Sequence, residues 1–384
     1  MSNTSNLIQV FKPMYRTQEV LDSIEICLES GWTGSGFRTD EFEEEWKKYS
    51  GFNNCHFVNS ATAGLHLAVR ILKQNFRWKD DDEIITTPLT FISTNHVILY
   101  ENMKPVFADV DKSLCMNPLS VKKLITSKTK AIIYVGIGGN TANYLKIVKV
   151  CKEYNLRLIV DAAHMAGSRV SDRDKHVGIE SDCTVFSFQS VKNCPSADSG
   201  AVCFSDGEHD KIARKMSWLG IDKTTYDRSG ENKYKWKYNV EEIGYKYHGN
   251  SIMASMCLVA LKYLDCDNSV RRKIADKYTK MLSHIKEIEI IQHENELTSS
   301  RHLFQISTDE RDSLLDFLAS HNIYCGVHYI ENTQYPIYHK YENSNINLAK
   351  HYSDRLISLP LHLHMNDKDV DEVIRIISVY FGYE

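Results

Sequence analysis

Between residues 55 and 160, short apolar runs alternate with segments of helical spacing, and this alternation limits the possible folds more than any other feature. The apolar runs predict strands at 55–58, 83–86, 105–108, 131–135 and 157–160. The segments between them predict helices at 60–73, 91–100, 117–125 and 141–154. Such alternation predicts a parallel sheet covered by helices on both faces, with ligands bound at the carboxyl ends of the strands.

The flanking regions extend this α/β pattern. Helices are expected at 17–30 and 39–49, before the alternation begins. Further on, the sequence predicts adjacent strands at 183–189 and 199–205, a long polar loop near 217–247, and helices at 251–264 and 269–288. The remaining segments predict a smaller α+β domain. We therefore expect a large domain over residues 1–260 and a small C-terminal domain over residues 261–384.

Composition excludes several classes of protein. The net charge is −4 and both signs are mixed along the 384 residues, so neither a nucleic-acid partner nor a membrane partner is expected. No apolar run is as long as a membrane span, and the start of the chain lacks the apolar core of a signal peptide. The ten cysteines form no CxxC pair, so no metal site is expected. We expect a cytoplasmic protein with reduced thiols.

Two segments near the start of the alternating region can contribute to a ligand site. Residues Asn59–Ala68 place small side chains where a strand turns into a helix, and the first N–H groups of such a helix can bind a phosphate. An ordinary N-capped helix is the alternative. In Pro88–Thr94, Phe91 follows a strand and can stack on a planar ring, or it can simply belong to the core.

Two later segments add charged groups. The apolar strand at 157–160 ends at Asp161, and a carboxylate buried there requires a cationic partner such as a protonated pyridine nitrogen. His164 can bond the phenolic oxygen of such a ring, or it can be structural. Lys192 follows an alternating strand and becomes a nucleophile if it is desolvated, although most lysines in loops lie on the surface. Ser187 can add a hydroxyl to the phosphate site.

Together these segments supply every part of a pyridoxal 5'-phosphate (PLP) site. They provide a phosphate cradle, an aromatic ring for stacking, an acid for the ring nitrogen and, in Lys192, an amine that can hold the cofactor as a Schiff base. Each segment alone has a simpler interpretation, but the four together, in this order along the chain, predict a PLP enzyme.

The same segments resemble the DegT/DnrJ group of nucleotide-sugar aminotransferases, which have the type I PLP fold of aspartate aminotransferase. The resemblance covers nearly the whole chain. It is carried by GWTGSG at 31–36, EIITTPLTFISTNHVILYENMKPVFADVD at 83–111, SDCTVFSFQSVKN at 181–193, GYKYHGNSIMASMCLVALKYLD at 244–265, GVHY at 326–329 and SLPLHLHMNDKDVDEVI at 358–374. It implies a mainly parallel seven-stranded sheet flanked by helices, with a smaller α+β C-terminal domain.

The resemblance also implies a role for individual residues. Lys192 is the Schiff-base lysine and proton shuttle, and Asp161 pairs with the ring nitrogen. His164, where the family usually has glutamine, lies near the ring oxygen. The other implied cofactor residues are Ala61, Thr62 and Ser187 at the phosphate and Phe91 on the ring. The implied sugar-nucleotide residues are Trp32, Thr33, His328 and Tyr329.

Several positions depart from the family pattern. Lys246 replaces an asparagine that reaches the phosphate across the dimer, so either this lysine or Asn250 is expected to take that role. His248 replaces an arginine, and Gly136–Gly139 (GIGG) replaces the family segment HLYG. These differences surround the expected pocket, so they bear on the substrate more than on the cofactor.

The implied reaction moves an amino group from L-glutamate to a nucleotide-linked 4-keto-6-deoxy sugar, giving a 4-amino-4,6-dideoxy sugar for a surface glycan. Alternatives are a 3-keto sugar nucleotide or a small phosphorylated or cyclitol ketone. A PLP-dependent sugar dehydratase is disfavoured because such relatives carry histidine in place of Lys192, and a non-enzymatic regulator is disfavoured by the intact Asp161, His164 and Lys192. A homodimer with active sites shared across its interface is expected.

Overall fold

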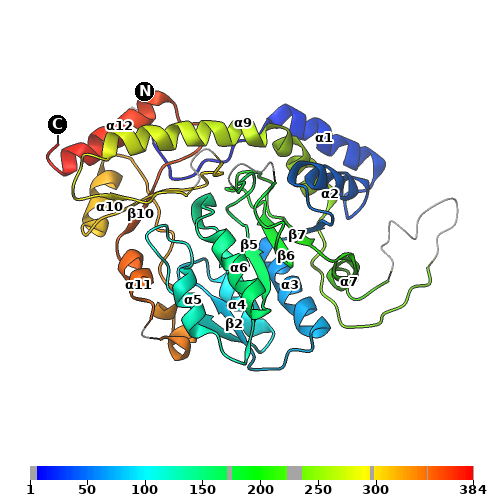
Figure 1. Ribbon diagram of the computed structural model, residues 1–384. Helices are drawn as coiled ribbons and strands as arrows, with labels where there is room; N and C mark the ends of the chain where they lie inside the picture. The colour runs from blue at the N-terminus through cyan, green and yellow to red at the C-terminus, as the bar shows by residue number, and fades with distance from the viewer. Residues whose placement is uncertain (1–6, 171–174, 223–235, 295–297, 344, 384) are drawn as a thin grey trace.

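The computed structural model describes residues 7–170, 175–222, 236–294, 298–343 and 345–383. Its centre is a seven-stranded sheet with the strand order β1-β7-β6-β5-β4-β2-β3 (Figure 1). Strands β3, β2, β4, β5 and β6 run parallel, whereas β7 is antiparallel to both β6 and β1. The strands are β1 His56–Val58, β2 Glu83–Thr86, β3 Lys104–Phe107, β4 Thr129–Val135, β5 Arg157–Asp161, β6 Cys183–Ser187 and β7 Gly200–Phe204. The predicted fold class is confirmed.

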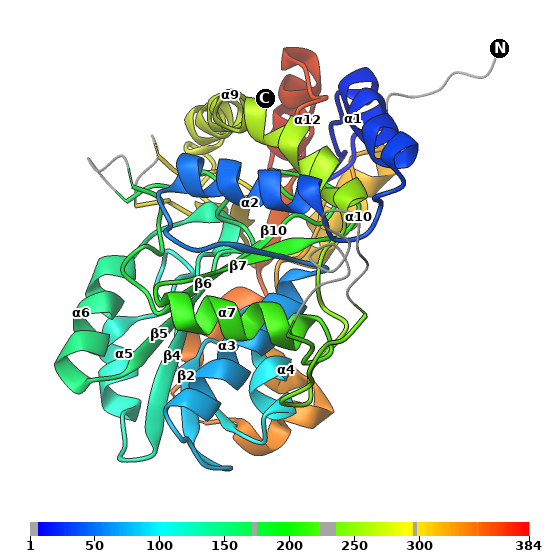
Figure 2. The ribbon, with the colours of Figure 1, turned by 90° about the vertical axis from the view of Figure 1, so that its right-hand side faces the viewer.

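Helices cover both faces of this sheet (Figures 1 and 2). Helix α3 packs on β6 and β7 and contacts α4 and α7, whereas α6 packs on β4 and β5 and contacts α5. Helices α1 and α2 contact the first part of α9, above the sheet in Figure 1. The bounds are α1 Thr17–Ser30, α2 Phe37–Ser50, α3 Ala61–Asn75, α4 Ser93–Tyr100, α5 Pro118–Leu124, α6 Tyr144–Tyr154, α7 Gly207–Ser217 and α9 Ser251–Leu282.

Alternate residues of the central strands pack into two different cores. Ala131 and Ile133 of β4 face the core beneath α3, α4 and α7, whereas Ile132 and Tyr134 face the core that includes residues of α2, α5, α6 and α9. A strand that is buried on both faces needs apolar residues at consecutive positions. This requirement explains why the central strands appear as continuous apolar runs in the sequence.

The C-terminal part forms a three-stranded antiparallel sheet with the order β10-β9-β8. A separate core packs this sheet against the second half of α9, α10 and α12. The bounds are β8 Glu289–Ile290, β9 Phe304–Ser307, β10 Leu356–Leu359, α10 Arg311–Ser320, α11 Asn347–Ser353 and α12 Asp367–Tyr380. The proposed division at residues 260 and 261 falls inside α9, which runs through it without a break, so the domain boundary remains a prediction.

The expectation of separate helices at 251–264 and 269–288 is wrong, because α9 is continuous from Ser251 to Leu282. The two expected helices leave out residues 265–268, which include Asp267 and Asn268. In the structure, Asp267 accepts two hydrogen bonds from Arg16, at 2.7 and 2.6 Å. Asn268 donates to the carbonyl oxygen of Ala166 at 3.0 Å. Both residues are buried and bonded to distant segments, so they stay in the helix while connecting it to the rest of the molecule.

The structure also contains two helices, α7 and α11, that the sequence analysis did not predict. Of the predicted polar loop at 217–247, residues 223–235 lie outside the described residues, and the flanking parts pair through isolated bridges between Trp218 and Lys246 and between Ile221 and Val240. Within the described ranges, no helix combines the length and the apolar character needed to cross a bilayer.

Close packing at Gly200 sets the distance between β7 and the first turn of α3. A Cβ atom at Gly200 would lie 2.6 Å from the Phe186 carbonyl oxygen and 2.8 Å from the Ala61 nitrogen. These are backbone atoms that cannot rotate away. We therefore predict that Gly200→Ala lowers the free energy of unfolding by about 1–3 kcal/mol, measured by urea denaturation.

Gly207→Ala is the matched control for this prediction. A Cβ atom at Gly207 would meet only Asn54 Oδ1, at 3.7 Å, and alanine favours helix α7, whose first residue is Gly207. Equal urea midpoints for Gly200→Ala and Gly207→Ala would show that crowding at Gly200 does not govern stability.

Candidate active site

A cavity of about 440 Å³ opens at the carboxyl ends of the parallel strands. The ends of β4, β5 and β6 and the first turn of α3 form its floor, and segments that precede β9 and β10 in the chain close one side. It is lined by Phe11, Ser60, Ala61, Thr62, Leu65, Thr90, Phe91, Ser93, Val135, Gly136, Asp161, Ala163, His164, Ser187, Gln189, Val191, Lys192, Asp198, His302, His328 and Tyr329.

Asp161 is a buried carboxylate at the last position of β5. Its Oδ2 atom accepts a hydrogen bond from the Thr94 hydroxyl at 2.7 Å, and its Oδ1 atom accepts one from the Ala163 N–H at 3.1 Å. Burial raises the pKa of Asp161, while these donors and the nearby charge of Lys192 act in the opposite direction. The site therefore favours a further cation or N–H donor beside this carboxylate.

Lys192 lies in the connection between β6 and β7. Its N–H group donates to the Gln189 carbonyl oxygen at 2.8 Å, in a tight turn that places the side chain against the cavity. Burial lowers the pKa of Lys192 to about 8, and the charge of Asp161 partly opposes this effect. A lysine with such a pKa is partly uncharged near neutral pH, so it can attack a carbonyl carbon or accept a proton.

The ring of His164 is fixed from both sides. Its Nδ1 atom lies 3.2 Å from the Gly138 N–H, which can only donate, so Nδ1 must be the acceptor. The proton of the neutral ring is then on Nε2, 3.2 Å from the Tyr329 hydroxyl oxygen. Burial lowers the pKa of His164 well below its usual value and keeps the ring neutral. His164 therefore offers a hydrogen-bond donor to the cavity.

The first turn of α3 forms the end of the cavity that can bind an anion. The Ser60 hydroxyl caps this helix by accepting from the Ala63 N–H at 3.1 Å. The N–H groups of Ala61 and Thr62 come earlier in the same turn, where a helix offers them no internal acceptor. Ser187 Oγ, at the end of β6, accepts from the Gln189 N–H at 3.4 Å and keeps its own proton for donation. These groups suit a phosphate.

The lining matches the chemistry of PLP. Asp161 would hold the ring nitrogen, Lys192 would bond the aldehyde carbon, His164 would donate to the phenolic oxygen, and Ala61, Thr62 and Ser187 would hold the phosphate. Phe91 is 56% exposed at the mouth of the cavity, with its ring centroid 5.9 Å from that of Tyr329, and it can cover a planar ring. The small side chain of Ala163 leaves space beside it.

The remaining predicted residues lie outside this cavity. Trp32 and Lys246 line a second cavity of about 690 Å³, together with His248. Thr33 lies next to Trp32, and its carbonyl oxygen accepts from the Ser251 N–H at 3.2 Å. Asn250 caps α9 by accepting from the Met253 N–H at 2.9 Å. One chain therefore brings together nine of the predicted site residues, and the other four lie around the start of α9.

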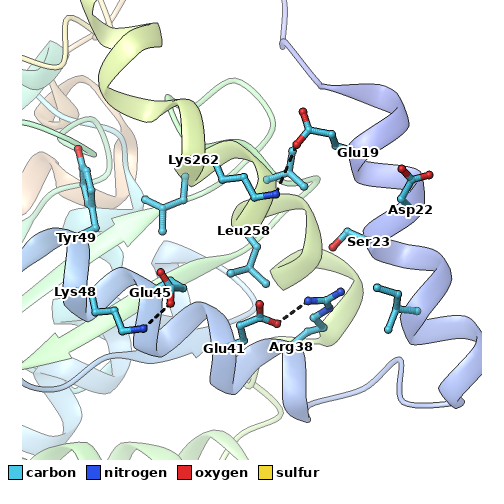
Figure 3. Close-up of a pocket in the computed structure, with 13 residues that line it drawn as sticks. Glu19, Asp22, Ser23, Arg38, Glu41, Glu45, Lys48, Tyr49, Leu258 and Lys262 are labelled. Carbon is cyan, nitrogen blue, oxygen red and sulfur yellow. Dashed lines mark hydrogen bonds and ion pairs between the residues drawn. The ribbon is translucent and has the colours of Figure 1, made fainter.

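A third cavity, of about 710 Å³, lies between α1, α2 and α9 (Figure 3). Its charged side chains are largely paired with one another: Arg38 with Glu41 at 2.6 Å, Lys48 with Glu45 at 2.7 Å, and Lys262 with Glu19 at 3.6 Å. It contains none of the desolvated groups of the Lys192 cavity. Size alone therefore does not identify the site, whereas the buried amine and carboxylate do.

Two of the cavity residues that the sequence analysis did not anticipate, Phe11 and His302, pack against one another. Phe11 precedes the first helix, and its ring stacks on His302 with centroids 5.4 Å apart. His302 lies just before β9, and its ring packs at a tilt of 39° against that of His164, with centroids 4.4 Å apart. Both residues reach the cavity from distant segments, and an isolated aromatic residue or histidine carries no local pattern that would reveal such a contact.

Comparison with known proteins agrees with this geometry. The model of the DegT/DnrJ/EryC1/StrS aminotransferase family matches residues 15–378. The chain belongs to this family. Spore coat polysaccharide biosynthesis protein SpsC of Bacillus subtilis is 32% identical over 376 residues, which cover 95% of each chain. Helicobacter pylori PseC, an aminotransferase involved in the biosynthesis of pseudoaminic acid, has a TM-score of 0.90 at 25% identity, covering 98% of this chain and 100% of that one.

A further solved neighbour bears on the cofactor. Spr1654 of Streptococcus pneumoniae was solved in a PLP form, with a TM-score of 0.87 and 26% identity, and in a PMP form, with 0.88 and 27%. The alignment with the PLP form covers 98% of this chain and 99% of the neighbour, and the alignment with the PMP form covers 97% and 98%. The protein is a PLP-dependent aminotransferase, and its relatives support the amination of a sugar. The expectations for family, cofactor and enzyme class are confirmed.

The depressed pKa of Lys192 leads to a prediction for the cofactor-free aminotransferase. With a pKa of about 8, about a quarter of Lys192 is uncharged at pH 7.5, compared with roughly 0.1% of an ordinary lysine. We expect PLP followed by borohydride to label Lys192 before any exposed lysine, with the adduct located by peptide mass spectrometry. Lys192→Ala should lose this adduct, and identical labelling of both proteins would contradict the assignment.

Proposed function

We propose that this aminotransferase moves an amino group from L-glutamate to a nucleotide-linked 4-keto-6-deoxy sugar. The observation that carries the proposal is the convergence of Lys192, Asp161 and the first turn of α3 on one cavity at the sheet edge. The family supplies the coarser part, a PLP-dependent amination of a sugar. The proposal adds to this the nucleotide, the 4-keto position of the sugar and L-glutamate as the amino donor.

The residues of this chain would divide the work between them. Bound PLP supplies an electron-accepting ring that stabilises negative charge on the carbon next to the transferred nitrogen. Asp161 keeps the ring nitrogen protonated, because a buried carboxylate favours an adjacent cation. The Nε2–H of His164 orients the ring through its phenolic oxygen. Lys192 would hold the cofactor through its Nζ atom, and the same atom, when free and uncharged, would accept and return the proton that the reaction moves.

The protein names of two relatives support a glycan pathway. SpsC is described as a spore coat polysaccharide biosynthesis protein, and PseC as an aminotransferase in the biosynthesis of pseudoaminic acid. We infer that this chain also produces an amino sugar, a 4-amino-4,6-dideoxy sugar nucleotide, for a surface glycan. His328 and Tyr329 line the cavity and are the proposed contacts to the sugar. Cytoplasmic synthesis fits the ten cysteines, all of which are free thiols.

Amination of a 3-keto sugar nucleotide, or of a small phosphorylated or cyclitol ketone, is the second candidate. A cavity of about 440 Å³ has room for a cofactor and one sugar ring, so it does not by itself select between keto positions. Dehydration is disfavoured because Lys192 is present as a lysine.

We also propose a homodimer in which each chain completes the site of its partner. Trp32 and Lys246 would then serve the partner's site, because in their own chain they line a different cavity from that of Lys192. Lys246 Nζ lies 3.5 Å from the ring centroid of Trp218, and burial lowers its pKa. Such a cation, held on an aromatic face, can turn towards a phosphate.

Lys246→Ala tests this arrangement. We expect it to weaken PLP retention at least about tenfold, since it removes a charge-assisted hydrogen bond to phosphate, as measured by the absorbance that remains after dialysis. Lys215→Ala is the matched control, because Lys215 lines the same cavity but pairs with Glu241 at 3.0 Å. Equal retention by both variants would reject the role of Lys246 at the phosphate.

A substrate screen tests the function itself. Nucleotide-linked 4-keto-6-deoxy sugars and 3-keto sugars, carried on UDP, dTDP or GDP, are incubated with L-glutamate while 2-oxoglutarate is measured. We expect 2-oxoglutarate to form with 4-keto-6-deoxy sugars and to depend on Lys192, so that Lys192→Ala gives none. Turnover limited to 3-keto sugars would favour the second candidate, and turnover of neither class would refute the sugar-nucleotide assignment.

A further inference from the structure

His302 contributes a second imidazole to the cavity, packed against His164 on one side and Phe11 on the other. It is buried in the approach to β9, and Lys192 and Asn193 belong to the loop that faces it. Its hydrogen bonds determine which of its two nitrogen atoms carries the proton, and this determines what the ring can do.

The side-chain amide of Asn193 can be oriented in only one way. Its Nδ2 atom lies 2.7 Å from the Ser300 carbonyl oxygen, which can only accept, so the amide nitrogen must face Ser300. The same nitrogen donates to Asn268 Oδ1 at 2.7 Å, and Asn268 Nδ2 donates to the Ala166 carbonyl oxygen at 3.0 Å. Every member of this buried chain is therefore fixed by a backbone carbonyl group.

The oxygen of Asn193 consequently faces His302. Asn193 Oδ1 lies 2.9 Å from His302 Nδ1, and because that oxygen can only accept, Nδ1 must carry the proton. The Nε2 atom of the neutral ring is then an unprotonated acceptor. His164 has the opposite tautomer, with its proton on Nε2. Two adjacent imidazoles thus give the cavity one donor and one acceptor.

Burial, followed by the basic groups around it, keeps His302 neutral. Lys192 lies on the loop after β6, Arg271 on α9, His164 after β5 and His328 before β10. Burial first, and then these groups, lower the pKa of His302 well below its usual value. Asp161, on β5, is the acidic group that acts on Lys192. Lys12, Asp267 and His362 line the small space behind Lys192 and His302.

We propose that His302 Nε2 accepts a hydrogen bond from the amine of Lys192 once that amine is released from the cofactor. This makes His302 a positioning residue that acts through Lys192. The inference rests on the proposed role of Lys192 as the cofactor lysine, and it does not depend on the identity of the sugar.

The tautomer suits this task. A neutral amine has two N–H groups and one lone pair, and the lone pair must be available to receive the proton from carbon. A hydrogen-bond donor beside Lys192 would occupy that lone pair. A hydrogen-bond acceptor instead binds one of the N–H groups of the amine and leaves the lone pair available. When the amine gains the proton it becomes an ammonium, and the same acceptor then stabilises its charge. No proton leaves or enters His302 in this step.

Two substitutions separate the nitrogen atoms of His302. In His302→Asn the side-chain amide can take the place of Nδ1 and still donate to Asn193, but the acceptor at the Nε2 position is lost. In His302→Gln the longer side chain puts its carbonyl oxygen near the Nε2 position and restores an acceptor. His293→Asn is the matched control, because His293 is also buried and bonded, through Nδ1 to Ser299 Oγ at 2.7 Å, in a neighbouring segment.

The measurement is the pH dependence of covalent PLP capture by the full-length, cofactor-free protein, trapped with borohydride and located by mass spectrometry. Capture needs the uncharged amine, so its midpoint reports the pKa of Lys192. Since an acceptor favours the ammonium, we expect His302→Asn to lower the midpoint by about one pH unit, while His302→Gln and His293→Asn keep the wild-type midpoint.

The outcomes distinguish this proposal from the one it rests on. A midpoint for His302→Asn equal to that of wild type, in protein whose thermal denaturation is also unchanged, overturns the role of His302 and leaves Lys192 in place. An equal shift in His302→Gln or in His293→Asn identifies a general packing effect and overturns the role as well. If wild-type protein captures PLP at a residue other than Lys192, the assignment of the cofactor lysine fails first.

Discussion

The buried carboxylate of Asp161 at the end of β5 sets the requirement that the rest of the active site meets. A carboxylate without a cationic partner is costly to bury, and in this chain two neutral donors, from Thr94 and Ala163, only partly compensate for that cost. Lys192 contributes positive charge from the next connection, yet burial lowers its own pKa. A cofactor whose ring nitrogen is protonated would satisfy the carboxylate and allow Lys192 to be neutral, which is the state its chemistry needs.

The fold brings these groups together through strand order. Because β5 and β6 are parallel neighbours, their carboxyl ends meet at one edge, and Asp161 and Ser187 come from those ends. The antiparallel strand β7 then returns beside α3, so the turn that carries Lys192 lies near the first turn of that helix. The close approach at Gly200 makes this possible, since any larger side chain would separate β7 from the backbone of α3.

Sequence reasoning placed the residues that occupy strand ends, because the pattern of an apolar strand followed by a polar residue is local. Asp161 and Ser187 are of this kind, and Lys192 lies in the connection that follows the strand ending at Ser187. It did not identify His302, whose importance comes from Asn193 and Asn268, two residues far from it in the chain. It also divided α9 across residues 265–268, since a polar residue in a helix carries no local sign that a distant partner will bury it.

The hydrogen bonds of Asn268 and Asn193 connect the long helix to the chemistry. Asn268 is part of α9, a helix that contacts both α1 and α12, and its bond to Asn193 fixes the residue next to Lys192. Together with the Ser300 carbonyl oxygen, Asn268 therefore holds Asn193 in the orientation that sets the tautomer of His302. A helix that joins two packed regions therefore also supports, through the buried side chain of Asn268, the orientation of the His302 ring beside Lys192.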